Sequence, residues 1–331
     1  MKIAVIGSGG WGTAIASLLA KNGHTVTLWS WKQEESDAIR ENKENKEFLP
    51  GVSLPDGIHY TANLEEAAGA ELIVIATPSA VLPKTVENLA PFVPTGIPIV
   101  NLTKGLCAET NRRFSEVIGA LCPHNPVVVL TGPSHAEEVG KGIPTTVLAA
   151  SKQADAAEMV QEAFMSPTFR VYTSSDVIGA ELGGALKNVI ALCAGVMDGL
   201  GFGDNTKAAL MTRGLAEMSR LGIKMGAAPE TFAGLSGIGD LIVTCTSMHS
   251  RNRRAGILIG QGKSVKEALE EVHMVVEGVY AAESAYKLSQ KYDVEMPIVS
   301  AAYRVLFEDA SPREEVLKLM QREKKAEKDL I

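Results

Sequence analysis

The first half of the chain alternates short runs of β-branched residues with helical patterns of apolar residues. Helical patterns occupy residues 12–23 and 79–93. Strands that are joined through helices run parallel, so this alternation predicts a parallel sheet covered by helices on both faces. Runs rich in Val and Ile that end at Gly, Thr, Ser or Pro predict strands at residues 2–7, 25–30, 71–77, 97–103 and 126–132, with last strands at 145–151 and 169–174.

The second half of the chain has a different pattern. From about residue 176 onward the apolar residues follow helical spacing, with no convincing strand. Residues 264–272, 279–292 and 313–330 predict amphipathic helices, and the charged end of the last one predicts a solvated face. A length of 331 residues also fits two domains. We therefore expect a dinucleotide-binding domain over residues 1–175 and a helical substrate domain over residues 176–331.

Composition excludes several classes of protein. Hydrophobic residues make up 46% of the chain and charged residues 21%, which is typical of a globular protein. A net charge of −7 argues against a nucleic-acid partner, although it permits an anionic substrate in a locally basic pocket. No targeting segment or membrane span is expected, because a strand begins almost at once and charges break the apolar windows. The cysteines form no close pair, which predicts a reduced, cytoplasmic protein without a metal site: Cys107, Cys122, Cys193 and Cys245.

A glycine pattern follows the first predicted strand and opens the first predicted helix. In this context Gly7-x-Gly9-x-x-Gly12 indicates a dinucleotide-binding loop rather than a plain turn between a strand and a helix. Gly7 permits the tight turn, Gly9 lets the backbone approach a pyrophosphate, and Gly12 lets helix and strand pack closely. The helix N-terminus offers N–H groups to the phosphates. The expected fold is an α/β Rossmann-type doubly wound sheet followed by a C-terminal all-α domain.

The segment after the second predicted strand bears on the choice of cofactor. A site that prefers NAD(H) usually has an acid at the end of this strand, about 20 residues after the glycine pattern. This chain has Trp31 and Lys32 there. Lys32 could meet a 2′-phosphate and Trp31 could lie against adenine. NADP(H) is therefore the favoured cofactor, and NAD(H) is possible. The alternative is that Trp31 and Lys32 are only surface residues. Residues 42–47, of sequence NKENKE, predict a surface loop.

A lysine in an apolar helix is the strongest chemical signal in the second half. Lys187 lies in the stretch ELGGALKNVIAL, where an ammonium must reach solvent, pair with an acid or take part in chemistry. Next to a dinucleotide it could supply the proton that a forming alkoxide needs during ketone reduction. Gly183 and Gly184, one turn earlier, would let a substrate or nicotinamide approach. Asp240 and Thr244, four residues apart, would share a helix face, and Asp240 could pair with Lys187.

Two further segments suggest anion binding. Ser250 is a good N-cap for a helix that starts at Arg251, and the turn Ser250-Arg251-Asn252 predicts a phosphate cradle. The alternative is a solvated basic face or a nucleic-acid patch, and the net charge of −7 disfavours the nucleic-acid patch. Lys104 ends a predicted strand, at the edge where open α/β sheets bind ligands, although a surface lysine in a turn explains it equally well.

Together these motifs resemble the bacterial type of NAD(P)-dependent glycerol-3-phosphate dehydrogenase. The resemblance covers nearly the whole chain through GSGGWGTA, TKG, GPSHAEE, ELGGALKNVIAL, TRGLAEMSRLG, GIGDL, TCTSMHSRNRRAG and VVEG. It implies reversible reduction of dihydroxyacetone phosphate to sn-glycerol 3-phosphate with NAD(P)H. It also implies a role in supplying glycerophospholipid synthesis and a small phosphate substrate as partner. A homodimer is possible.

The resemblance also implies roles for single residues. Lys187 resembles the general acid/base and Lys104 a contact to both substrate and cofactor. Asn188, Asp240 and Thr244 resemble groups that orient Lys187 and the substrate hydroxyls. A serine is common in the family where this chain has Gly10, so a side-chain contact there is in doubt. Further implied cofactor contacts are Gly10, Trp11, Ala136, Arg251, Val275 and Glu277, and implied substrate contacts are Gly132, Ser134, Ser250, Arg251 and Asn252.

Two other readings compete. Dehydrogenases of the 3-hydroxyacid or 6-phosphogluconate type also join a Rossmann domain to a helical domain, but they typically place an asparagine four residues after the lysine. This chain has Ala191 there and Asn188 directly after Lys187. A cofactor-binding sensor without catalysis would need the glycine loop but not Lys187, Asp240 and Arg251.

Overall fold

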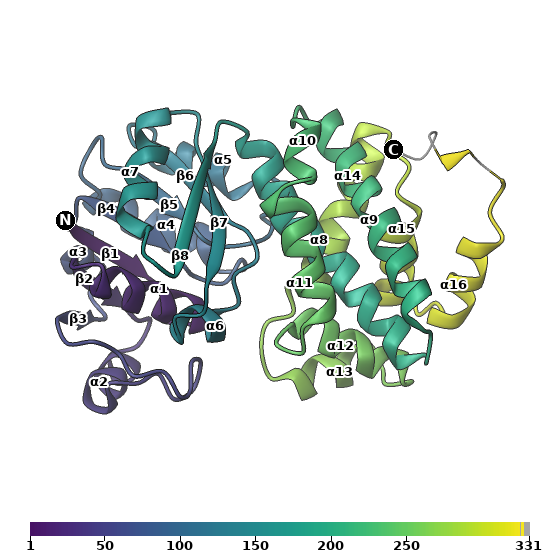
Figure 1. Cartoon of the computed structure of the whole chain (residues 1–331), viewed down its shortest axis with the longest axis horizontal. Helices are drawn as coiled ribbons and strands as arrows, with labels where there is room; N and C mark the ends of the chain where they lie inside the picture. Colours follow the sequence, from purple (N-terminus) through teal and green to yellow (C-terminus); the bar gives the residue numbers. More distant parts are fainter. Residues whose placement is uncertain (325, 328–331) are drawn as a thin grey trace. The chain divides into compact units, whose positions relative to one another are not determined.

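The computed structural model describes residues 1–324, 326 and 327. The chain forms two compact units (Figure 1). The sheet unit contains Met1–Thr103 and Phe114–Val177, and the helical unit contains Lys104–Arg113 and Ile178–Ile331. The predicted boundary after residue 175 lies two residues from the change of unit at Val177, but residues 104–113 belong to the helical unit instead of the first domain.

The sheet unit is built on a single eight-stranded sheet in the order β3-β2-β1-β4-β5-β6-β7-β8. The order reverses direction between β1 and β4, which is the switch point where doubly wound sheets bind ligands. The strands are β1 Lys2–Ile6, β2 Thr25–Trp29, β3 Ile58–Thr61, β4 Leu72–Ile75, β5 Ile99–Asn101, β6 Val127–Thr131, β7 Thr145–Ala150 and β8 Phe169–Ser174.

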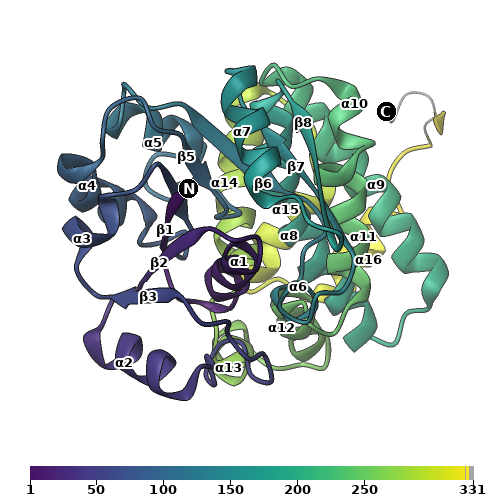
Figure 2. The same ribbon diagram turned by 60° about the vertical axis from the view of Figure 1, so that its left-hand side comes forward.

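Helices cover this sheet, and Figure 2 shows α1 beside β1 and β2. Apolar side chains of the strands and helices form one buried core, which includes Val5, Ile15 and Val74. The helices are α1 Gly10–Lys21, α2 Gln33–Asn42, α3 Leu64–Ala68, α4 Leu82–Leu89, α5 Phe114–Leu121, α6 Ala136–Gly140 and α7 Ala154–Phe164, with the short 3-10 helix η1 Ala90–Phe92.

Two features of the sheet differ from the sequence prediction. Strand β3 was not predicted, because IHYT is short and mixes polar with apolar residues. The predicted parallel sheet is present except at β7, which runs antiparallel to β6 with Val129 opposite Ala150. A parallel connection needs a crossover along the sheet. Only the five-residue helix α6 connects these strands, whereas α7 connects the parallel pair β7 and β8.

The named elements of the helical unit are all helices among its described residues, as the sequence predicts (Figure 1). An isolated β-bridge joins Leu106 to Arg113. The predicted helix over residues 313–330 is shorter, since α16 ends at Met320, and residues 325 and 328–331 lie outside the described part. The elements are α8 Val177–Gly199, α9 Asp204–Lys224, α10 Pro229–Phe232, the π-helix η2 Leu235–Gly239, α11 Asp240–Thr246, α12 Arg251–Gly260, α13 Val265–Val272, α14 Glu277–Tyr292, α15 Pro297–Phe307 and α16 Pro312–Met320.

Helix α8 is the central helix of this unit. Among the described residues it alone is long and apolar enough to cross a membrane, by length and composition, but 89% of its most apolar window is buried. The core helix of a soluble protein passes the same test. Its burial explains why the helix is apolar on all sides.

Glycines let α12 approach α8 closely. A Cβ built at Gly256 would lie 2.0 Å from the carbonyl oxygen of Leu192, and one built at Gly195 would lie 2.0 Å from that of Arg253. Gly199 and Gly260, one turn further along each helix, are equally crowded. Because no side chain separates the two backbones, the start of α12 is held at a fixed place beside α8.

The segment Lys104–Arg113 packs with the helical unit. Leu106 is buried in the same core as the apolar residues of α8. Arg113 forms a buried ion pair with Glu181 of α8, with 3.0 Å between Nη1 and Oε2. The sequence places this segment after a strand, and long-range contacts alone assign it to the other unit.

Candidate active site

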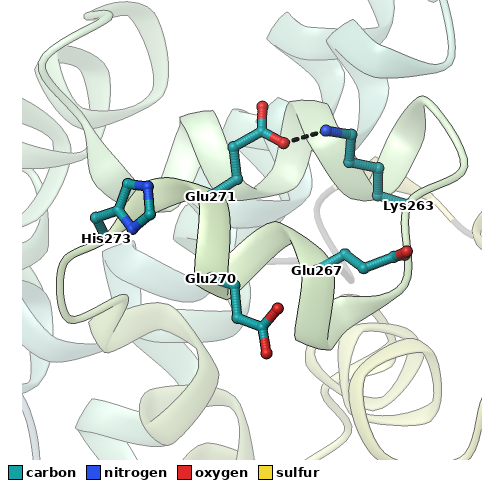
Figure 3. A pocket seen from close by; sticks show the side chains of 5 residues that line it. All are labelled: Lys263, Glu267, Glu270, Glu271 and His273. Atoms are coloured by element: carbon teal, nitrogen blue, oxygen red, sulfur yellow. Dashed lines mark hydrogen bonds and ion pairs between the residues drawn. The ribbon is translucent and has the colours of Figure 1, made fainter.

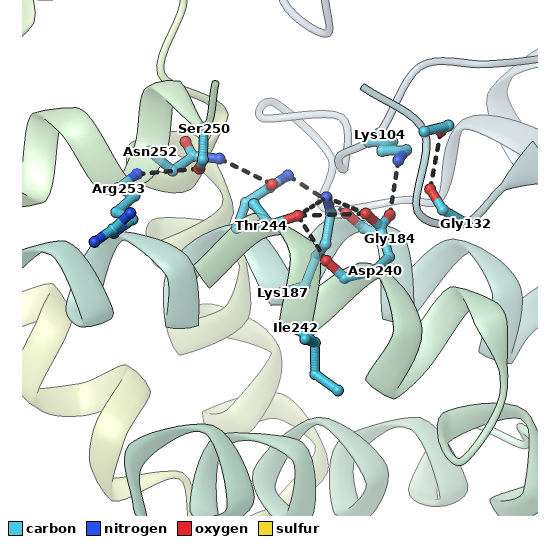
Figure 4. Close-up of polar contacts among 12 residues, drawn as sticks. Lys104, Gly132, Gly184, Lys187, Asp240, Ile242, Thr244, Ser250, Asn252 and Arg253 are labelled. Atoms are coloured by element: carbon cyan, nitrogen blue, oxygen red, sulfur yellow. Dashed lines mark hydrogen bonds and ion pairs between the residues drawn. The ribbon is translucent and has the colours of Figure 1, made fainter. Parts of the chain in front are cut away.

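Lys187 lies in the middle of α8 and is only 5% exposed. Its Nζ donates to Oδ1 of Asp240 at 2.7 Å and to Oγ1 of Thr244 at 2.6 Å (Figure 4). Asp240 and Thr244 are one turn apart on α11, as their spacing predicts, and the predicted pair of Lys187 with Asp240 is present. Thr244 in turn donates to the backbone carbonyl of Asp240 at 2.6 Å. The bonds to Asp240 and Thr244 use two of the three N–H donors of the Lys187 ammonium and leave the third for another acceptor.

Asp240 joins a second lysine to the cluster. Its other oxygen, Oδ2, accepts from Nζ of Lys104 at 2.7 Å. Asp240 is 1% exposed, whereas the side chain of Lys104 is 20% exposed. One buried carboxylate therefore holds two ammonium groups within hydrogen-bond distance. The cluster of Lys187, Asp240, Thr244 and Lys104 is called the lysine cluster below.

Burial controls the protonation of Lys187. Burial and the positive charge of Lys104 disfavour the charged form of Lys187, whereas Asp240 favours it. Burial and Lys104 together outweigh Asp240, so the pKa of Lys187 is lowered to about 8. For Asp240, burial alone would raise the pKa. The charges and hydrogen bonds of the two lysines outweigh it and hold the pKa of Asp240 below its usual value. Lys187 is thus able to gain or lose a proton near neutral pH, next to a carboxylate that stays ionised.

Asn188 and Asn252 contact each other rather than Lys187. Nδ2 of Asn252 donates to Oδ1 of Asn188 at 2.9 Å, and Oδ1 of Asn252 accepts from the backbone N–H of Gly278 at 2.8 Å. Nδ2 of Asn188 points to the carbonyl of Gly184 at 3.4 Å. Both amides are buried. Asn252 therefore links α8 to the start of α14, one residue beyond Glu277, while Val275 lies two residues before that helix.

The turn before α12 is held by its own hydrogen bonds. Ser250 caps the helix as predicted, with its Oγ accepting from the N–H of Arg253 at 3.2 Å. The guanidinium of Arg253 donates to Asp198 at 2.8 Å and to the carbonyl of Thr246 at 2.6 Å. Arg251 is the first residue of the helix and is partly exposed. Arg253, which sequence reasoning did not single out, thus fixes the turn that carries Ser250 and Arg251.

The two glycines before Lys187 do not both serve the role expected for them. A Cβ built at Gly183 would lie 2.4 Å from the backbone carbonyl of Ser236. Gly183 therefore lets η2 pack directly against α8, just before Asp240. This contact fixes the distance between Lys187 and Asp240, whereas the expectation was that Gly183 would let a ligand approach.

The glycine loop of the sheet unit has the geometry that a pyrophosphate needs. Gly7 has φ +118°, which side chains rarely adopt, and a Cβ at Gly12 would lie 1.9 Å from the carbonyl oxygen of Gly7. A Cβ at Gly9 would meet nothing within 4 Å, so the loop is open at the position where a phosphate would approach. Helix α1 begins at Gly10 with no acid in its own first turn, so its side chains add no negative charge beside the N–H groups that a helix N-terminus offers to an anion.

Asn45 supports this loop and was missed by sequence reasoning. Its Nδ2 donates to the carbonyl of Ser8 at 2.6 Å and to Oγ1 of Thr13 at 2.9 Å, and its Oδ1 accepts from the N–H of Phe48 at 3.1 Å. Asn45 is 2% exposed, so the prediction of a surface loop over residues 42–47 is wrong at this position. Asn45 lies among charged residues that indicate an exposed loop, and no sequence motif marks a single buried amide.

The segment around Asn45 also explains Gly10. A Cβ built at Gly10 would lie 2.5 Å from the carbonyl oxygen of Phe48. Gly10 in this chain therefore permits close contact with the backbone of residue 48. The same built Cβ would lie 3.7 Å from the Cβ of Ala136, so Ala136 is beside the loop.

Among the other predicted residues of the sheet unit, Trp11 lies in the first turn of α1, and the rest follow β2 or β6. Trp31 is 72% exposed, and its ring meets Trp29 edge-on. Lys32 is the exposed N-cap of α2. Gly132 follows β6 with φ +139°, and Oγ of Ser134 donates to its carbonyl at 2.9 Å.

A surface hollow of about 380 Å³ lies elsewhere, at α13 (Figure 3). Its charged side chains already serve the helix, since Glu267 completes a capping box with Ser264 and Lys263 pairs with Glu271. Among residues 1–324, 326 and 327, no group of three His, Cys, Asp or Glu is placed to hold a metal ion. None of the residues that line this hollow belongs to the lysine cluster.

Comparison with known proteins identifies the family. Residues 2–157 match the family model for the N-terminus of NAD-dependent glycerol-3-phosphate dehydrogenase, and residues 176–317 match that for its C-terminus. A protein of Desulfitobacterium hafniense named glycerol-3-phosphate dehydrogenase, NAD(P)+, is 53% identical over 98% of this chain and 93% of its own length. A protein of the same name from Pelotomaculum thermopropionicum is 54% identical over 100% of this chain and 96% of its own length.

A solved structure agrees with the sequence relatives. The crystal structure of glycerol-3-phosphate dehydrogenase from Coxiella burnetii superposes with a TM-score of 0.94 at 37% identity, and covers 97% of this chain and 99% of that one. The two family models and the near full-length relatives favour this family over the 3-hydroxyacid dehydrogenase, 6-phosphogluconate dehydrogenase and sensor alternatives. The chain belongs to the NAD(P)-dependent glycerol-3-phosphate dehydrogenase family.

Proposed function

We propose that this chain reduces dihydroxyacetone phosphate to sn-glycerol 3-phosphate with NADPH or NADH, and catalyses the reverse oxidation. The lysine cluster is the observation that carries the proposal. Its buried ammonium, with a pKa of about 8, suits a group that donates a proton in one direction and accepts it in the other. The relatives are named for NAD(P)+ and glycerol 3-phosphate, which fits this chemistry.

The residues of the chain divide the work as follows. A reduced nicotinamide dinucleotide, held by the glycine loop of Gly7, Gly9 and Gly12, would supply the hydride for the carbonyl carbon. As that bond forms, the carbonyl π electrons move onto oxygen, and the Lys187 ammonium donates its proton to the resulting alkoxide. Lys187 is left as a neutral amine and recovers a proton from solvent. Asp240 and Thr244 hold Nζ of Lys187 in place, and Lys104 adds positive charge that stabilises the developing oxyanion.

The same proposal assigns the remaining sequence-predicted residues. Ser250, Arg251 and Asn252 bind the substrate phosphate at the N-terminus of α12, where the helix N–H groups and a guanidinium favour an anion. Arg251 also reaches the cofactor. Gly7, Gly9, Gly10, Trp11 and Gly12 hold the dinucleotide with Trp31, Lys32, Ala136, Val275 and Glu277, while Gly132 and Ser134 contact substrate.

The cellular setting is part of the proposal. All four cysteines are buried and free, which fits a reducing compartment such as the cytoplasm. The product would supply glycerophospholipid synthesis. A homodimer stays a prediction, and sedimentation of the purified protein tests it. The domain roles, dinucleotide binding over residues 1–175 and substrate binding over residues 176–331, are likewise proposed.

The direct test is an assay of purified protein with dihydroxyacetone phosphate, followed by nicotinamide absorbance with NADPH and NADH in parallel. We expect oxidation of both cofactors that depends on the substrate. With Lys187 as the acid, the rate of reduction should fall about ten-fold per pH unit above a pKa near 8, and the rate of oxidation should rise up to that pH. Binding of either dinucleotide without turnover of this substrate would contradict the proposal.

A further inference from the structure

The sheet unit places an acid against the glycine loop that the sequence pattern does not reveal. Oγ of Ser8, which lies between Gly7 and Gly9, donates to Oε1 of Glu35 at 2.6 Å. Ser8 is buried, and Glu35 is half-buried in the first turn of α2. The strand end itself has no acid, so the usual NAD(H) signature is absent from the sequence at the expected position.

The position of Glu35 matches the place where the adenosine ribose binds in dinucleotide folds. Ile6 of β1 is paired with Trp29 of β2, and the N–H of Gly7 donates to the carbonyl of Trp29 at 3.0 Å. The loop after β1 and the segment after β2 therefore leave the sheet side by side. An acid after the second strand normally accepts the ribose 2′-hydroxyl at this edge. Glu35 brings its carboxylate to the same edge from the first turn of the following helix.

The carboxylate also has a free acceptor. Oε1 is used by Ser8, and Oε2 remains for a ligand hydroxyl. Lys32, the exposed N-cap of α2, carries the opposite charge three residues earlier. A ribose hydroxyl is attracted by Glu35, whereas a 2′-phosphate is repelled by Glu35 and attracted by Lys32.

We propose that Glu35 is a specificity-determining residue of the cofactor site. It accepts the ribose 2′-hydroxyl of NAD(H) and opposes the 2′-phosphate of NADP(H), so that together with Lys32 it allows the chain to use both cofactors. This inference rests on the proposed function, since it concerns how the same dinucleotide site chooses its ligand. Glu35 could also act only by holding Ser8, and the experiment separates these roles.

The test measures the dissociation constants of NAD+ and NADP+ by calorimetry on the full-length protein, and kcat/KM for NADH and NADPH in parallel. Glu35→Gln removes the charge and keeps the shape and the acceptor for Ser8. The matched control is Glu34→Gln, which removes the same charge from the exposed neighbour in the same turn. Ser8→Ala removes the hydrogen bond to Glu35 and keeps the carboxylate.

In Glu35→Gln we expect weaker binding of NAD+ and equal or tighter binding of NADP+, with a change of about ten-fold in the ratio of the two constants, the size of one charge-assisted hydrogen bond. Glu34→Gln and Ser8→Ala should leave that ratio close to the wild-type value. A ratio that does not move in Glu35→Gln, or a loss of equal size for both dinucleotides, would overturn the inference. Wild-type protein that binds neither dinucleotide would overturn the proposed function itself.

Discussion

The glycine loop and the lysine cluster are built in opposite ways. The loop offers backbone groups, and its important residues are those without a side chain, because a Cβ at Gly7 or Gly12 would collide with backbone atoms. The cluster offers side chains, and its important residues are charged groups buried together, such as Lys187 and Asp240. The first site is thus sensitive to volume, and the second is sensitive to charge.

This difference follows from the role that we propose for each site. Binding a pyrophosphate needs several N–H groups in a fixed array, and helix geometry supplies them without any ionisable group. Proton transfer needs a group whose pKa lies near the working pH, and burial next to one carboxylate and a second lysine provides it. The comparison predicts that steric and electrostatic substitutions will separate the two sites.

The largest effect is expected for Lys187→Ala. Loss of the proton donor should lower kcat by ~10²–10⁴-fold, the usual contribution of general acid catalysis. The dissociation constant of NADP+ should change little, because the glycine loop is untouched. Steady-state kinetics and calorimetry check both statements, with Lys141→Ala, an exposed lysine of the sheet unit, as the control. A fully active Lys187→Ala protein would remove Lys187 from the mechanism.

Asp240→Asn should damage both stability and the pH profile. It leaves Lys104 and Lys187 without the shared carboxylate, and breaking a buried pair from one side costs about 3–5 kcal/mol of unfolding free energy. Because Asp240 raises the pKa of Lys187, its loss should move the alkaline fall in reduction rate to a pH below about 8. Urea unfolding and rate–pH profiles measure the two effects.

The control for Asp240→Asn is Asp56→Asn, which breaks the exposed pair with Lys43. An exposed pair of this kind contributes little to stability, because water and salt screen the two charges. Equal loss of stability in the two variants would show that burial of Asp240 does not matter energetically, contrary to the comparison.

Two glycine substitutions should distinguish folding from binding within the loop. Gly12→Ala forces a Cβ against the carbonyl of Gly7, so it should cost ~1–3 kcal/mol of unfolding free energy as an overpacked contact. Gly9→Ala meets nothing within 4 Å, so it should unfold like the wild type yet bind NADP+ more weakly. Thermal melts and calorimetry on both variants test this. Equal destabilisation by the two would contradict the steric account.

The smallest effect is expected for Asn45→Ala. Removing the amide leaves the carbonyl of Ser8 and the N–H of Phe48 without this partner, at a cost of about 1 kcal/mol per hydrogen bond. The KM for the cofactor should rise several-fold while kcat stays near the wild-type value, because the lysine cluster is unchanged. Asn42→Ala, an exposed asparagine at the end of α2, is the control. A fall in kcat with unchanged KM would argue against a role in holding the loop.

The fold was largely predictable from local patterns. Val- and Ile-rich strands, the glycine loop at β1 and the helical second half all follow from short-range periodicity, and so does the pairing of Asp240 with Thr244 on one helix face. The prediction failed where local signals are weak, as in β3, or where a short connection decides direction, as at the antiparallel β7. Asn45 and Glu35 carry no motif, and only their contacts across the chain reveal them.

By itself the sequence determined the family, the sheet of the first half, the helices of the second half and the lysine that we propose as the proton donor, because glycines, caps and apolar spacing act over one or two turns of chain. Only the tertiary structure decided that Lys104 belongs with Lys187 and Asp240, that Gly183 serves helix packing, and that the pKa of Lys187 falls to about 8. Those properties depend on burial and on charges brought together from residues 104, 187 and 240, which are far apart along the chain and meet only when it folds.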